Sequence, residues 1–80
     1  MSAGAQLPLA MVHEGEKVRV VRVSGNDEMR RHLENLGFVE GAEVHVITQT
    51  GASGSIVKVK GSQLGVDHAT AMHVYTTTED

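Results

Sequence analysis

Cysteine and tryptophan are absent from this chain of 80 residues, and proline, phenylalanine and tyrosine occur once each. Without cysteine there is no disulfide, thiolate metal ligand or thiol nucleophile, so zinc ribbons, disulfide-rich scaffolds and thiol redox enzymes are excluded. A chain of this length forms one domain around one core. Because aromatic residues make up only 2% of the sequence, aliphatic side chains must fill that core.

Positive charge and long apolar runs are scarce as well. Seven Lys and Arg residues face ten Asp and Glu residues, which gives a formal net charge of −3 at pH 7. Nucleic-acid binding takes most of its affinity from basic side chains, so this balance predicts no nucleic-acid partner. The apolar run at residues 7–12 contains Pro8 and is far shorter than the roughly 20 residues of a membrane span. We therefore expect no membrane insertion and a cytoplasmic location.

Short strands dominate the expected structure. Valines alternate with polar residues in several segments, which is the pattern of half-buried strands. The expected strands are residues 17–23, 43–48, 56–60, 64–66 and 73–76. Val20 and Val21 are adjacent, so the alternation in the first strand slips by one residue, which is typical of a bulge. Residues 7–12 are expected to be extended at the sheet edge, and residues 51–55 to form a hairpin loop.

One α-helix is predicted at about residues 27–36. Asn26 is a suitable N-cap residue, and an apolar stripe recurs at helical spacing. The stripe consists of Met29, Leu33 and Leu36. Gly37 stands where a left-handed residue ends a helix, and Phe38 follows at the position that folds back on the last turn.

The order of these elements predicts a mainly β fold, a small β-barrel of about five strands with one helix. Asp67, a second N-cap residue, adds a short helical turn near residues 68–72. A single domain is expected over residues 7–76. Residues 1–6 are expected to be a disordered N-terminus, and residues 77–80 an acidic tail.

Three segments of the chain combine in a recognisable pattern. They are Glu14–Lys17, Leu36–Gly41 and Ile56–Val66. Together they resemble the ferrous-iron transport protein A family, FeoA, over about residues 7–75. The resemblance implies an SH3-like barrel, similar also to the C-terminal domain of iron regulators of the diphtheria-toxin-repressor type. It further implies a cytoplasmic accessory protein that binds the cytoplasmic part of the FeoB transporter and modulates Fe²⁺ uptake or its GTP turnover.

The sequence departs from the family pattern at two places. Ser55 directly follows Gly54, where family members often carry Asp-Pro, and Ser62 and Asp67 stand where a bulky residue or Arg is common. The hairpin tip and the fourth strand are therefore expected to recognise a different partner surface, or none.

A protein-binding surface is expected because the sequence shows no catalytic constellation. The serines lie in loops without a neighbouring histidine motif, and no glycine-rich phosphate loop occurs. We therefore predict no enzymatic activity and no cofactor, and a homo-oligomer is compatible with the sequence. The expected partner-binding residues are Met29, Leu36, Phe38, Val39, Ile56, Lys58 and Lys60. Structural roles are expected for Gly37, Gly41 and Gly61.

Basic side chains at non-core strand positions predict a positive face. They are Lys17, Arg19, Lys58 and Lys60. These side chains either form a solvated surface or dock onto an acidic protein surface. On the helix, Arg30 is expected to pair with Glu34 at i, i+4 rather than to reach a nucleotide phosphate.

The histidines offer only weak metal candidates, namely His13, His68 and His73. The spacing of His68 and His73 points their side chains apart, so no metal site is predicted. Two alternatives to the transport role stay open. One is a free-standing metal-responsive regulatory domain, and the other is a nucleic-acid-binding barrel, which the acidic balance and the shortage of aromatic residues oppose.

Overall fold

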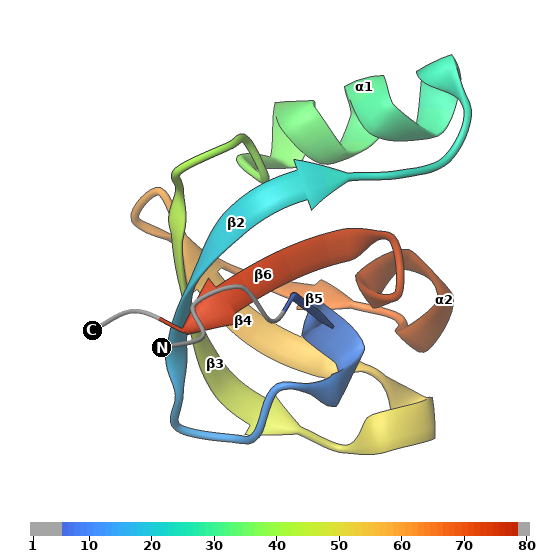
Figure 1. Cartoon of the computed structure of the whole chain (residues 1–80). Coiled ribbons are helices and arrows are strands. Elements are labelled where there is room, and N and C mark those ends of the chain that lie inside the picture. The colour runs from blue at the N-terminus through green and yellow to red at the C-terminus, as the bar shows by residue number, and fades with distance from the viewer. Residues whose placement is uncertain (1–5, 79–80) are drawn as a thin grey trace.

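The computed structural model describes residues 6–78 and contains one antiparallel sheet of six strands in the order β1-β6-β2-β3-β4-β5 (Figure 1). The strands are β1 (Leu7–Pro8), β2 (Lys17–Val23), β3 (Glu43–Gln49), β4 (Ser55–Val59), β5 (Ser62–Val66) and β6 (Val74–Thr78). Most of the expected N-terminal disordered segment, and residues 79–80 of the expected tail, lie outside the described residues.

The helical elements are α1 (Asp27–Leu36), α2 (His68–Ala71) and two 3-10 turns, η1 (Leu9–Met11) and η2 (Gly51–Ser53). In Figure 1, α1 lies beside β2, whereas α2, η1 and η2 pack together at another side of the sheet. None of the helices in residues 6–78 has the length and apolar character that a membrane crossing needs.

The mainly β architecture is confirmed and is consistent with an SH3-like fold, but the sheet is not closed into the expected barrel. The sheet has two free edges, β1 and β5. Strand β1 is only two residues long because Pro8 has no N–H for a ladder and the chain then turns into η1. Within residues 6–78, β1 and β5 do not pair with each other, so the sheet stays open.

Strand β2 has the predicted bounds, and the predicted bulge is confirmed. Its pairing with β6 shifts register between Val20 and Arg22, which leaves Val21 as the extra residue. Before the bulge, Val18 and Val20 are buried, while Lys17 and Arg19 are exposed. The bulge therefore changes which side chains face the core along the second half of the strand.

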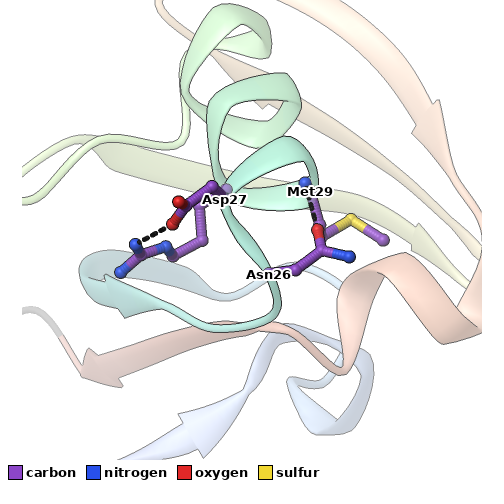
Figure 2. A network of polar contacts seen from close by, with 4 residues as sticks. Asn26, Asp27 and Met29 are labelled. Carbon is purple, nitrogen blue, oxygen red and sulfur yellow. Dashed lines mark hydrogen bonds and ion pairs between the residues drawn. The ribbon is translucent and has the colours of Figure 1, made fainter.

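Helix α1 also has the predicted bounds, and both of its ends are capped as expected. The Asn26 side chain accepts a hydrogen bond from the Met29 N–H at 2.8 Å (Figure 2). At the other end Gly37 adopts a left-handed conformation with φ 110°. The Gly37 and Phe38 N–H groups then donate to the carbonyls of the last turn, which is a Schellman stop.

The expected ion pair on α1 is replaced by another. Arg30 Nη2 lies 2.7 Å from Asp27 Oδ1, at i, i+3, rather than pairing with Glu34 (Figure 2). Asp27 stands in the first turn, where its negative charge also complements the helix dipole. Arg30 is therefore held toward the N-terminal end of its own helix, and it contributes only a surface pair to stability.

The core is formed mainly by valines from five strands together with three larger side chains. The largest fully buried side chains are Phe38, Leu9, Leu33, Val12, Val20, Val44, Val46, Val57, Val59, Val74 and Thr76. Leu9 and Val12 come from the segment that was expected to be extended. The 3-10 turn η1 replaces that expected strand because it brings both side chains inward within four residues.

The bounds of β3, β4, β5 and β6 differ from expectation by one or two residues. Lys60, expected as the last residue of a strand, forms the turn between β4 and β5 together with Gly61, with φ 53° and 79°. Strand β6 continues to Thr78, so Thr77 and Thr78 are part of the sheet and not of a tail. Their partners are Arg19 and Val18 on β2.

Gln49 ties the N-terminal segment to the β3–β4 loop. Its Nε2 donates to the Val12 carbonyl at 2.6 Å, and its Oε1 accepts from Ser55 Oγ at 2.7 Å. Ser55 is buried, and so is Val12. The NH₂ group and the carbonyl oxygen of the Gln49 side chain therefore both hydrogen-bond to groups of buried residues.

We expect Gln49→Ala to lower the free energy of unfolding by about 1–3 kcal/mol, because the Val12 carbonyl and the Ser55 hydroxyl lose their hydrogen bonds to the Gln49 side chain. Urea unfolding followed by circular dichroism measures the change. Gln63→Ala, at an exposed position of β5, is the matched control and should stay within about 0.5 kcal/mol of wild type. Equal midpoints for the two variants would contradict the bridging role of Gln49.

Candidate binding groove

A groove of about 540 Å³ lies on the solvent side of β2, β3 and β4. We call it the lysine groove, and its lining residues are Lys17, Gly41, Ala42, Glu43, His45, Lys58, Lys60 and Gly61. All three lysines of the chain are among them. The structure thus gathers in one concave surface side chains that stand far apart in the sequence.

Strand register explains how these side chains meet. Lys17 on β2 lies opposite His45 on β3, and His45 lies opposite Lys58 on β4. The three side chains therefore form a row across neighbouring strands. Because side chains alternate along a strand, the adjacent valines face the core while this row faces solvent. Lys17 and Lys58 are exposed, and His45 is half-buried between them.

Lys60 enters the groove from the β4–β5 turn. Its backbone has φ 53°, which makes it the single non-glycine residue with positive φ in the described part of the chain. Lys60 and Gly61 form a two-residue hairpin turn in which both residues have positive φ. The Lys60 stem also lies against the end of α1, since a Cβ built on Gly37 would be 3.1 Å from Lys60 Cγ.

Gly41 fixes the end of the groove near β2. Its N–H donates to the Val20 carbonyl at 2.8 Å, and its carbonyl accepts from Arg19 Nη1 at 2.9 Å. Arg19 lies opposite Glu43 in the sheet. The predicted structural role of Gly41 fits its φ of 88°, a conformation that glycine adopts without strain.

The expected apolar partner residues are dispersed. Phe38 is 0% exposed, so it belongs to the core and not to a surface; its position at the Schellman stop turns the ring inward. Leu36 and Val39 are half-buried and pack against the same core. Sequence spacing alone does not distinguish Leu36, Phe38 and Val39, because all three lie at the same helix end.

Two other predicted partner residues line separate hollows. Met29 lies with Glu28 and His32 in a hollow of about 290 Å³ on α1. Ile56 is 38% exposed and lies near Asp67 in a hollow of about 340 Å³ at the β3–β4 loop. Neither residue lines the lysine groove, whereas Lys58 and Lys60 both do.

The three histidine candidates do not converge. His13 and His68 are exposed, and within residues 6–78 no group of three or more His, Cys, Asp or Glu side chains is placed to hold a metal ion. His73 is half-buried, and its Nδ1 lies 3.0 Å from Ser24 Oγ. The Ser24 N–H also donates to the His73 carbonyl at 2.8 Å.

Sequence reasoning missed the contact between Ser24 and His73, because the two residues are 49 positions apart and no local motif marks them. The pair ties the segment before α1 to the start of β6. A Cβ on the neighbouring Gly25 would lie 2.9 Å from Met29 Cγ and 3.6 Å from His73 Nδ1. The contact therefore closes a packed junction between the helix and the sheet.

Asp67 caps α2 and gives this helix a predictable pH dependence. Its Oδ1 accepts from the Thr70 N–H at 2.8 Å. Hydrogen bonds from the Thr70 side chain and backbone hold the pKa of Asp67 below its ordinary value of 3.8. A depressed carboxyl pKa stabilises the folded state above the unfolded pKa, and this contribution is lost as pH falls through the folded value.

We therefore expect the N-cap of α2 to weaken as the pH falls through the lowered pKa of Asp67, which lies below 3.8. The amide of Thr70 should report this loss in a pH titration followed by NMR. Asp67→Asn keeps a cap acceptor but removes the titration, so its Thr70 amide should not follow this transition. A Thr70 titration unchanged in the asparagine variant would assign the acid effect to another group.

Comparison with known proteins gives a consistent picture. A family model described as FeoA domain matches residues 7–77. The crystal structure of an iron uptake regulatory protein, FeoA, matches with a TM-score of 0.87 and 24% identity, covering 94% of this chain and 100% of that one. FeoA of Stenotrophomonas maltophilia, determined with zinc and described as an SH3 domain protein, has 26% identity and a TM-score of 0.74. That match covers 85% of this chain and 86% of that one.

A longer protein shares the fold at lower sequence identity. IdeR of T. acidophilum has a TM-score of 0.80 and 16% identity; the match covers 99% of this chain but 37% of the regulator. At that identity the likeness concerns the fold alone. None of the curated proteins matches the sequence.

Proposed function

The chain belongs to the FeoA domain family, and from this premise we propose that it is a non-enzymatic accessory protein of ferrous iron transport. Its partner is the cytoplasmic part of a FeoB-type membrane transporter, whose Fe²⁺ uptake or GTP turnover it modulates by binding. The observation that carries this proposal is the family match, which extends over residues 7–77 and so includes nearly every described residue.

Three further observations support a role through contacts. The family is a small accessory domain and not a known enzyme family. The FeoA protein of Stenotrophomonas maltophilia is described as a candidate bacterial ferrous iron transport activating factor. A domain with one small core and an open groove on its sheet suits binding to another protein, since the groove is accessible without any rearrangement.

The experiment compares ferrous iron uptake in cells with and without the gene, together with co-purification of the tagged full chain and the transporter. We expect deletion to change Fe²⁺ uptake and the wild-type gene to restore it. The tagged chain should retain the transporter in detergent extracts. Normal uptake after deletion, together with no recovery of the transporter, would refute the proposal.

A further inference from the structure

We propose that the lysine groove binds an extended acidic segment of a protein partner. The inference rests on the proposed function for the identity of that partner, but the chemistry of the segment follows from the groove itself. Its carboxylates would pair with Lys17, Lys58 and Lys60, while its backbone lies along the concave surface over β2, β3 and β4.

The first argument is the distribution of charge. Three lysines and Glu43 give the groove lining a formal charge of +2, so with −3 on the whole chain the rest of the protein carries −5. Arg19, whose guanidinium donates to Gly41 at the groove rim, adds to the positive side. A concave positive surface on an otherwise acidic domain orients an acidic ligand to one place.

The second argument is the spacing of the lysines. Lys17 and Lys58 stand on strands separated by β3, so their backbones are about 9.5 Å apart. To bind one small anion together, the side chains of Lys17 and Lys58 would have to converge on it. Their convergence would cost rotamer entropy and would bring two positive charges close together. Carboxylates at alternate positions of an extended chain recur about every 6.6 Å. Several such carboxylates along one extended segment can each contact a different lysine, so the lysine side chains need not converge.

The third argument is the conformation of Lys60. The first position of this turn favours Asn, Asp or Gly, because φ is positive there and a Cβ is strained unless a short polar side chain hydrogen-bonds locally. The stem of Lys60 lies near Gly37 at the end of α1, but no hydrogen bond or ion pair within residues 6–78 uses its ammonium group. Strain at a surface position of this kind points to a role for the side chain itself.

Nucleic acid fits the groove less well than an acidic peptide. Single-stranded nucleic acid binds basic grooves that also offer aromatic side chains for stacking, and the lining contains no Phe, Tyr or Trp. Phe38 is buried, and the Tyr75 ring is covered by Arg22, whose guanidinium carbon lies 4.1 Å from the ring centroid. The negative charge on the rest of the domain also repels a long polyanion.

The test titrates the isotope-labelled full chain with a synthetic peptide of alternating Glu and Gly, and with the same peptide carrying Gln in place of Glu. We expect amide shifts centred on Lys17, His45, Lys58 and Lys60 with the glutamate peptide, and far smaller shifts with the glutamine peptide. The affinity should fall as salt is raised.

Lys60→Asn is the informative variant because it improves the turn while removing the charge. It should bind the glutamate peptide about threefold more weakly, and Lys58→Gln combined with Lys60→Asn about tenfold more weakly. The melting temperature of Lys60→Asn should stay close to that of wild type, because the better turn offsets the loss of the lysine stem near Gly37. Misfolding then does not account for the weaker binding. Arg31→Gln removes one positive charge from α1, outside the groove, and should bind as wild type does.

Three outcomes would overturn the inference. They are equal binding of the glutamine peptide, unchanged binding by the double lysine variant, and tighter binding of a single-stranded oligonucleotide or inorganic phosphate at the same residues.

Co-purification with the transporter distinguishes a failure of the groove proposal from a failure of the proposed function. A wild-type chain that binds the glutamate peptide but not the transporter refutes the proposed function alone. A double variant that retains the transporter as well as wild type refutes the role of the groove alone.

Discussion

Replacing Phe38 by alanine is expected to lower the free energy of unfolding by about 3–5 kcal/mol. The ring is 0% exposed and packs in the same core as Leu33, whose carbonyl accepts from the Phe38 N–H at 3.1 Å. A single aromatic side chain in a small core cannot be replaced by neighbours, so its removal leaves a cavity. Urea unfolding monitored by circular dichroism measures the loss, which is a large part of the roughly 5–15 kcal/mol of a typical domain.

Val39→Ala is the matched control, since Val39 is the next residue and only half-buried. It should cost clearly less than Phe38→Ala. Comparing the two variants also tests the prediction that Phe38 lies on a partner-binding surface. Because the ring is buried, a Phe38→Ala protein that loses binding would do so through unfolding. A Phe38→Ala protein that is as stable as Val39→Ala would show that the ring is not part of the core in solution.

Replacing Gly37 by valine is expected to cost about 3 kcal/mol. The residue has φ 110°, where a β-branched side chain is strained. A Cβ at this position would also lie 3.1 Å from Lys60 Cγ and 3.6 Å from Val59 Cγ1. The substitution therefore combines backbone strain with crowding between the end of α1 and the β4–β5 turn. Thermal and urea unfolding both measure the change.

Gly41→Val separates the two contributions. Gly41 also has positive φ, 88°, but a Cβ there would meet no atom within 4 Å. Gly41→Val should therefore show the cost of backbone strain without the cost of crowding, and it should destabilise the domain less than Gly37→Val does. Equal losses in the two variants would mean that the contact between Gly37 and Lys60 carries no packing cost.

Local signals allowed the sequence to predict the elements that depend on them. Strand β2 follows from its alternating valines, and its bulge from the adjacent Val20 and Val21. Helix α1 follows from Asn26 at one end and Gly37 at the other. In each case the preference lies within a few residues of chain, where capping and side-chain alternation act directly.

Features that depend on contacts between residues far apart in the sequence could not be predicted from local patterns. The alternating run after Leu7 predicted an extended segment, but tertiary burial of Leu9 and Val12 favours a 3-10 turn. The sequence predicted a positive face from Lys17, Arg19, Lys58 and Lys60, yet the groove that the three lysines line together with His45 depends on the register of β2 against β3 and of β3 against β4. Register is set by the core as a whole, and so no single motif announces it.

The order of strands in the sheet has a consequence for how the domain folds. Strands β3, β4 and β5 pair with their nearest neighbours in sequence, but β6 returns to β2, and β1 joins β6 through a pair as distant as Leu7 and Thr76. Closing such long loops is slow, so folding should begin in the central meander. The β1–β6 edge, secured in part by the 2.9 Å bond from Thr76 Oγ1 to the Leu7 carbonyl, then assembles last and opens first.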